Sequence, residues 1–428
     1  MHHFDHREII TFQNKTSLNE YIVNGRRFNM TYTIGLVPSP GVAHKLVEHA
    51  IPKIKQQLHE RIDEVDDWHF ERKVDLLIGS AEDVHESIDK AAELKETHQW
   101  DVVICITDLP SISGNKVVIS DFNSEKRVSM LSLPALGWID LERKLVKSMT
   151  TLVEQLYHNN TKERPKVHPL IQPKAVDPRE DDSPKRRYIN RFLILGWIQL
   201  ILGLTRANEP WKNLFNFKKI ISVAFATGTY VSIFSMPWEL SVQYSTIRFI
   251  VLMIISILGM AGWLLYAHQL FEEKTAKSQR VYRYTYNATT LLTLVMITLM
   301  NYIVLYVLLS ISVSLFVPVS LFNNWTSANP DFTFVNYLKL LWFVSSLGLL
   351  AGAMGSTVEN EEKIRRITYS YRQYHRYKEA QQEEKEKETQ QSQDVSHREV
   401  EQSSSNHESN DDEPYEGKKQ DHREEDDA

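Results

Sequence analysis

The sequence predicts an α/β N-terminal cytoplasmic domain, followed by an all-α bundle of four transmembrane helices and a disordered acidic tail. Strand-like and helix-like apolar patterns alternate from residue 30 to residue 158, which is typical of an α/β domain. Four apolar stretches of membrane-spanning length follow between residues 220 and 357. The tail, 381–428, holds 17 acidic and 6 basic side chains and almost no large apolar ones, so it cannot bury enough surface to fold.

The predicted α/β domain, 30–158, follows a polar N-terminal extension, 1–29, that lacks the apolar core of a secretory signal. Strands are predicted in "MTYTIGLVPS", "WHFERKVDLLI", "WDVVICITDLP", "NKVVISDF" and "RVSMLSLPAL". The third of these is apolar on both faces, as expected of a central parallel strand covered by helices. Helices are predicted in "GVAHKLVEHAIPKIKQQLHERI", "AEDVHESIDKAAELKETHQ" and "DLERKLVKSMTTLVEQLYH". Pro52 is expected to kink the first helix or to split it in two.

Residues 159–187 contain five prolines and no hydrophobic periodicity, so we interpret them as a Pro-rich linker. The next segment, 188–219, contains an apolar stretch, 192–204, whose 13 residues would rise only about 20 Å as a helix. The hydrocarbon core of a bilayer is about 30 Å thick. Basic residues flank the stretch on both sides, and basic flanks stay in the cytoplasm. We therefore predict an interfacial or re-entrant amphipathic segment, with a short span as the remaining alternative.

Four spans are predicted in the membrane domain, 220–357, at about 220–236, 249–267, 288–317 and 334–355. Basic residues are concentrated before the first span, between the second and third, and after the fourth. This distribution predicts a multi-pass protein of the plasma membrane with both termini in the cytoplasm. The third stretch has 30 residues, so it must tilt or project beyond the bilayer.

Basic and aromatic side chains around the spans indicate contact with anionic lipid headgroups. The juxtamembrane segment, 358–380, mixes six cations with four tyrosines directly after the last span. The Trp and Arg side chains near the short apolar stretch are also of the kinds that lie at the level of the lipid headgroups. The residues expected at the lipid interface are Arg186, Arg187, Arg191, Trp211, Arg365, Arg366, Arg372 and Arg376.

Small residues line one face of the fourth span at spacings of three and four: Ser345, Gly348, Gly352 and Ser356. Such a face lets helix backbones approach closely. It predicts a helix-packing surface, and it could also support a homo-oligomer through this span.

Ligands of open α/β sheets bind at the carboxyl ends of the strands. This rule selects Ser39 and Gly41 after the first strand, where backbone N–H groups at a helix start could hold a small anion. It also selects Asp108 and Asp121, whose carboxylates could bind a sugar hydroxyl or a hydrated cation. The alternative is that all four are ordinary turn and cap residues.

Stronger chemical signatures are absent from the sequence. It contains no dinucleotide-binding or phosphate-binding glycine motif, no zinc-protease motif and no nucleophile elbow. We therefore predict no catalytic residue, no metal ligand and no cofactor. The tail carries a net charge of −11 and the rest of the chain only +5, which does not indicate a nucleic-acid partner.

Six motifs of the chain are distinctive as a set: "YTIGLVPSPGVAHKL", "WDVVICITDLP", "SLPALG", "RANEPW", "AFATGTY" and "LAGAMGSTVENEE". Together they resemble a family of uncharacterised polytopic membrane proteins of Gram-positive bacteria, and the resemblance covers about residues 30–375. Some relatives carry the label methylene-tetrahydrofolate dehydrogenase. The chain lacks the glycine pattern that such an enzyme needs for its dinucleotide, so the resemblance implies an architecture and not an activity.

The leading functional hypothesis is a non-enzymatic membrane protein whose cytoplasmic α/β domain senses a ligand or docks a partner. The alternative is a membrane-tethered small-molecule enzyme that uses Asp108 and Asp121 in its strand-end loops. A transporter component is the third hypothesis. It ranks last because the spans hold few of the ionisable groups that mark an ion or substrate pathway.

Overall fold

The computed structural model describes residues 31–74, 84–158, 174–176, 185–190, 192–272, 280–326, 333–355, 364–365 and 367–368. All of them belong to one compact unit of the chain, Met1–Gln373. The predicted extension, 1–29, and the predicted tail, 381–428, lie outside the described residues.

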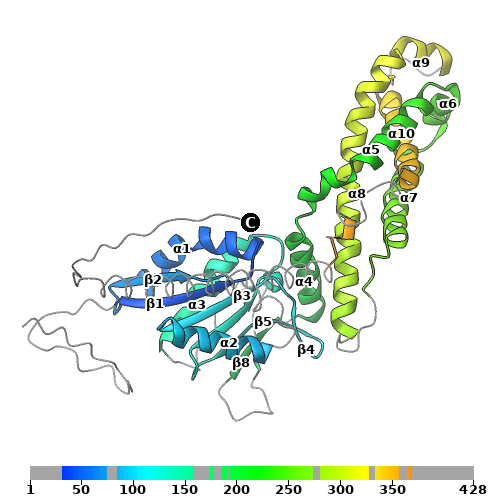
Figure 1. Ribbon diagram of the computed structural model, residues 1–428. Helices are drawn as coiled ribbons and strands as arrows, with labels where there is room; N and C mark the ends of the chain where they lie inside the picture. Colours follow the sequence, from blue (N-terminus) through cyan, green and yellow to red (C-terminus); the bar gives the residue numbers. More distant parts are fainter. Residues whose placement is uncertain are drawn as a thin grey trace, which may run out of the picture. The chain divides into compact units, whose positions relative to one another are not determined.

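The N-terminal part is an α/β domain built on one mixed sheet, as predicted (Figure 1). The strands are β1 (Thr31–Pro38), β2 (Asp67–Arg72), β3 (Val102–Thr107), β4 (Ser111–Ser113), β5 (Lys116–Asn123), β6 (Val128–Ser132), β7 (Lys174–Val176) and β8 (Lys185–Ile189). Their order is β2-β1-β3-β6-β5-β8-β7, with β4 paired to β5. Neighbouring strands among β2, β1, β3 and β6 run parallel, whereas β5 is antiparallel to β6 and to β8.

Helices cover both faces of the sheet. On one face, α1 (Val42–Arg61) and α3 (Leu141–His158) bury Ile34 and Ile104 in the main core. On the other face, α2 (Val84–Thr97) packs against Val103 and Cys105. The central strand β3 is therefore buried on both sides, as its uninterrupted apolar sequence predicts. Pro52 does not split α1, which runs as one helix through it.

Two strands lie in the segment interpreted as a linker, and this is a correction to the sequence interpretation. β8 pairs with β5 along its whole length, and β7 pairs with β8. Tyr188 of β8 is buried in the main core and stacks on Phe122, with ring centroids 5.8 Å apart. The charged sequence "KRRYI" has little apolar content, and its place in the sheet comes from backbone pairing with β5, which sequence periodicity does not record.

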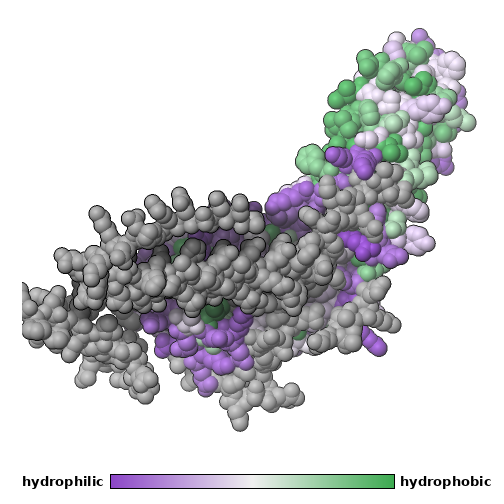
Figure 2. All heavy atoms as spheres, viewed as in Figure 1, coloured by the Kyte–Doolittle hydropathy of each residue, from purple (hydrophilic) through white to green (hydrophobic). Residues whose placement is uncertain are grey.

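The C-terminal part is helical. It contains α4 (Leu193–Ala207), the 3-10 helix η2 (Pro210–Phe217), α5 (Lys218–Ser232), α6 (Ser235–Gln243), α7 (Thr246–Ala267), α8 (Arg280–Phe316), α9 (Val319–Thr326) and α10 (Thr333–Gly355). Among the described residues, α7, α8 and α10 are long and apolar enough to cross a membrane. A fourth span is present if η2–α5 and α6, which are bent by 87° at a short break, count as one. In the face drawn in Figure 2, the coloured surface of the bundle is largely hydrophobic, and the coloured patches visible on the α/β domain are mainly hydrophilic.

The third span differs from the predicted one in length. α8 has 37 residues and begins at Arg280, eight residues before the predicted start. Its length is about 55 Å at 1.5 Å per residue, far more than the hydrocarbon core of about 30 Å. Its first turns contact the α/β domain, because the Tyr282 hydroxyl donates a hydrogen bond to the Ile112 carbonyl at 3.4 Å. The excess length therefore projects toward the sheet.

The small-residue face of α10 packs against α5. A Cβ atom on Gly348 would lie 2.6 Å from the Ala224 carbonyl oxygen, and one on Gly352 would lie 3.0 Å from the Ala224 Cβ. Ser345 is fully buried on the same helix, and Ser356 lies outside the described residues. The small-residue face of α10 therefore packs against a helix of the same chain.

Candidate functional site

The carboxyl ends of β1, β3 and β6 lie side by side at one edge of the sheet. Pro38 is paired with Ile106, and Thr107 is paired with Ser132. The polar side chains of Ser39, Asp108 and Ser132 are all buried at this edge. The parallel pairing of β1 with β3 therefore places Ser39 and Asp108, which the strand-end rule selected separately, at the same edge of the sheet.

Hydrogen bonds join these strand-end loops to one another. The Asp108 backbone N–H donates to the Ser39 hydroxyl oxygen at 3.1 Å, and the Ser132 hydroxyl donates to the Leu109 carbonyl at 2.7 Å. Gly41 has a φ of 95° and precedes the first turn of α1. The Ser39 and Ser132 hydroxyls thus fix loop conformation, which is the turn-and-cap alternative raised by the sequence.

Asp121 does not lie at this edge. It is in the middle of β5, opposite Met130, and its Oδ1 accepts a hydrogen bond from Arg187 Nε at 2.7 Å. Arg187 also donates to the Ser113 hydroxyl at 2.7 Å. The strand-end rule fails here because β5 is antiparallel, so its carboxyl end points to the opposite edge of the sheet.

The same ion pair places Arg187, expected at the lipid interface, within the sheet. Arg186 belongs to β8 and is paired with Phe122. Trp211 is in η2 with 42% of its surface exposed, and Arg365 is also exposed. Four of the expected interface residues lie outside the described residues: Arg191, Arg366, Arg372 and Arg376.

The short apolar stretch forms α4, and one face of this helix belongs to the α/β core. Leu200 and Leu204 are buried in the main core. Gly203 faces the loop after β6, where a Cβ atom would lie 2.1 Å from the Pro134 carbonyl oxygen. The opposite face is apolar and exposed, with Ile194 75% exposed. One face of α4 is therefore covered by the α/β domain and is not available to lipid.

The end of α4 connects the sheet to α8 through a set of contacts that we call the joint, formed by residues 134–138, 203–211 and 282–293. The Arg206 guanidinium donates to the Trp138 carbonyl, and the Trp138 and Trp211 rings meet edge to face at 6.2 Å. Asn208 Nδ2 donates to the Thr293 hydroxyl oxygen at 2.8 Å. The joint brings "SLPALG" and "RANEPW" together, although neither motif indicated a chemical role in the sequence.

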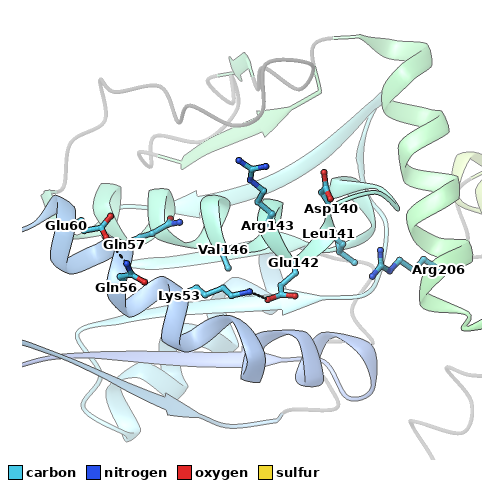
Figure 3. A pocket seen from close by; sticks show the side chains of 10 residues that line it. All are labelled: Lys53, Gln56, Gln57, Glu60, Asp140, Leu141, Glu142, Arg143, Val146 and Arg206. Carbon is cyan, nitrogen blue, oxygen red and sulfur yellow. Dashed lines mark hydrogen bonds and ion pairs between the residues drawn. The ribbon is translucent and has the colours of Figure 1, made fainter.

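A cavity of about 650 Å³ lies between α1, the start of α3 and the end of α4 (Figure 3). Its lining offers both hydrogen-bond donors and acceptors: Lys53, Gln56, Gln57, Glu60, Asp140, Leu141, Glu142, Arg143, Val146 and Arg206. An ion pair of 2.6 Å between Lys53 and Glu142 links α1 to α3. The hydrogen bond from Lys53 holds the pKa of Glu142 below its usual value. The volume is within the range of small-ligand sites.

Sequence reasoning missed this cavity, because its lining residues sit on the outer faces of helices, where polar residues are ordinary. The only available signal was the repeat of Lys53, Gln57 and Glu60 along one face of α1. Within the described residues, no group of three or more His, Cys, Asp or Glu side chains could hold a metal ion. Comparison of the chain with models of known protein families, with curated proteins and with solved structures finds no match.

Proposed function

We propose that the protein is a non-enzymatic sensor or docking protein of the plasma membrane, in which the α/β domain binds a small polar ligand and α4 couples it to the membrane helices. In this proposal the α/β domain and both termini are cytoplasmic, and the chain crosses the membrane four times. We also propose membership of the Gram-positive membrane protein family, contact with anionic lipid, and a disordered acidic tail.

The observation that carries the proposal is the shared position of α4. One face of this helix completes the core of the α/β domain through Leu200 and Leu204. Asn208, the residue directly after the helix, donates a hydrogen bond to Thr293 of α8. A change at the sheet can therefore reach a membrane helix through packed side chains and hydrogen bonds, without a flexible tether.

The cavity beside the joint is the proposed ligand site. Arg206 belongs both to the cavity lining and to the joint, so a ligand that contacts its guanidinium competes with the Trp138 carbonyl. The lining combines amide groups, carboxylates and cations, which suits a ligand with both hydroxyl and anionic groups, such as a sugar phosphate. Asp108 and Asp121 are less suited to a catalytic role, because Asp108 is buried between loops and Asp121 is paired with Arg187.

Thermal-shift measurements on the full-length protein in detergent test this proposal with a panel of sugar phosphates, nucleotides and folates. At least one compound should raise the unfolding temperature, and Arg206→Gln should abolish that rise. Lys126→Gln is the matched control, because Lys126 is an exposed cation that pairs with Asp89, and neither residue lines the cavity. The control should respond like the unaltered protein. An equal response of the Arg206→Gln variant would exclude this cavity, and turnover of the compound would contradict the non-enzymatic assignment.

A further inference from the structure

The α-helical part of the first candidate span is shorter than α7. α5 has 15 residues and α7 has 22, which correspond to about 22 Å and about 33 Å of helix. Exposed Lys218 and Lys219 begin α5, and lysine side chains at a helix end place their ammonium groups at the headgroup level. A helix that starts there and rises about 22 Å stops short of the far side of a hydrocarbon core about 30 Å thick, and tilting shortens its reach further.

The break after α5 is a built feature of the fold. α6 turns away by 87°, so the chain does not continue across the bilayer in the direction of α5. The Trp238 indole N–H donates to the Ser232 carbonyl at 2.7 Å, and the Ile233 N–H donates to the Tyr230 carbonyl at 3.3 Å. These bonds satisfy backbone groups at the break, as a helix end at membrane depth requires.

α6 has one buried face and one exposed face, and the exposed face includes Met236. Pro237, Trp238 and Ser241 are buried, and the helix contacts α10 and α9. Glu239 and Gln243, four residues apart, are both exposed. An exposed carboxylate is costly in hydrocarbon, so this face of α6 requires water or headgroups.

We propose that the bilayer is thinned beside α5 and α6, with α6 lying flat among the phospholipid headgroups and its Glu239 face in water. The thinning matches the short reach of α5 and keeps Glu239 out of hydrocarbon, whereas α7 and α10 cross a bilayer of ordinary thickness. The partner of this surface is therefore phospholipid, with the headgroups drawn toward the bilayer centre on the α5–α6 side.

Single-cysteine labelling of the full-length protein in a Cys105→Ala background tests the inference. A membrane-impermeant maleimide is applied to open membrane fragments, so the result does not depend on which side faces the cytoplasm. A cysteine at Glu239 should be labelled, as should the exposed control Ser245→Cys just before α7. Cysteines at Tyr230, exposed on the last turn of α5, and at Ile254, exposed within α7, should remain unlabelled because lipid covers them.

The same variants are then reconstituted in short-chain and in long-chain phosphatidylcholine. Labelling at Glu239 should persist in both lipids, because the protein thins the bilayer locally. Loss of this labelling in either preparation would overturn the proposal, and so would labelling at Tyr230, which would put the end of α5 in water. Failure here leaves the sensor proposal intact, since that proposal rests on α4 and the cavity.

Discussion

Substitution of Gly203 by alanine should separate α4 from the α/β domain. Gly203 is the point of closest approach between α4 and the loop after β6. An added Cβ atom would lie 2.1 Å from the Pro134 carbonyl oxygen and 2.8 Å from the Pro134 Cα and carbonyl carbon. These are backbone atoms, so no side-chain rotation relieves the clash, and α4 has to move outward.

The expected cost follows from the packing on either side of Gly203. Overpacking a close contact typically costs about 1–3 kcal/mol, and the movement also loosens Leu200 and Leu204, which are buried in the main core. Full loss of one such leucine side chain typically costs about 2–5 kcal/mol. Alanine favours the helix over glycine by about 1 kcal/mol, which offsets a part of this cost. We therefore expect Gly203→Ala to lower the free energy of unfolding by about 1–3 kcal/mol.

The assay is thermal unfolding of the full-length protein in detergent, compared with Gly262→Ala as a matched control. Gly262 also lies in a helix, and an added Cβ atom there would meet no atom within 4 Å. The control should unfold at the same temperature as the unaltered protein or slightly above it, because only helix propensity changes. If Gly203→Ala is as stable as the control, α4 does not pack on the α/β domain as described.

Gly348→Ala should destabilise the bundle by about 1–3 kcal/mol in the same assay, because its Cβ atom would lie 2.6 Å from a backbone carbonyl of α5; an unchanged unfolding temperature would contradict this packing. A soluble fragment 29–160 should be markedly less stable in thermal unfolding than a fragment 29–208, since only the longer one contains β8 and α4; equal stability would show that these elements are dispensable. The pKa of Glu142 is lowered in the folded state, so the Lys53–Glu142 ion pair should stabilise the protein at pH values above the ordinary pKa of a glutamate. This contribution should disappear as the pH falls through the lowered pKa of Glu142. Lys53→Met should therefore reduce the unfolding temperature slightly at neutral pH and not at strongly acidic pH, and a pH-independent difference would contradict the assignment.

The fold was predictable where a sequence pattern reflects burial by protein alone. The run "VVICIT" is almost entirely apolar because β3 is covered on both faces. This pattern predicted the central position of β3 in the sheet. The short apolar helix α4 was harder, since lipid and a protein core select the same apolar side chains. Its length argued against a crossing and left a short span as the alternative, and only the contact between Gly203 and Pro134 identifies the α/β domain as its partner.

Predictions about side-chain sites depended on strand direction and on pairing across long separations. Asp121 was selected by the strand-end rule, which holds for parallel strands, whereas β5 is antiparallel to its neighbours and the Asp121 carboxylate pairs with Arg187. Arg187 lies 66 residues away in sequence, in a segment without apolar periodicity. Ser39 and Asp108 were both selected because they follow strands, but their contact depends on the neighbouring positions of β1 and β3, which the sequence does not record.

The most direct test of the central claim, that α4 packs on the α/β domain and does not cross the membrane, is a cysteine-accessibility map on intact cells in a Cys105→Ala background. Single cysteines are placed at Ser183 before α4, at Ser278 between α7 and α8, and at Ser327 between α9 and α10, and they are exposed to a membrane-impermeant reagent. The account predicts labelling at Ser327 and shielding at both Ser183 and Ser278, because the α/β domain and the start of α8 lie on the cytoplasmic side. Labelling at Ser183 with shielding at Ser278 would contradict the four-span account. With α5–α6 counted as one span, this span and α7 return the chain to the side on which it started, so the chain would then have to cross the membrane within α4.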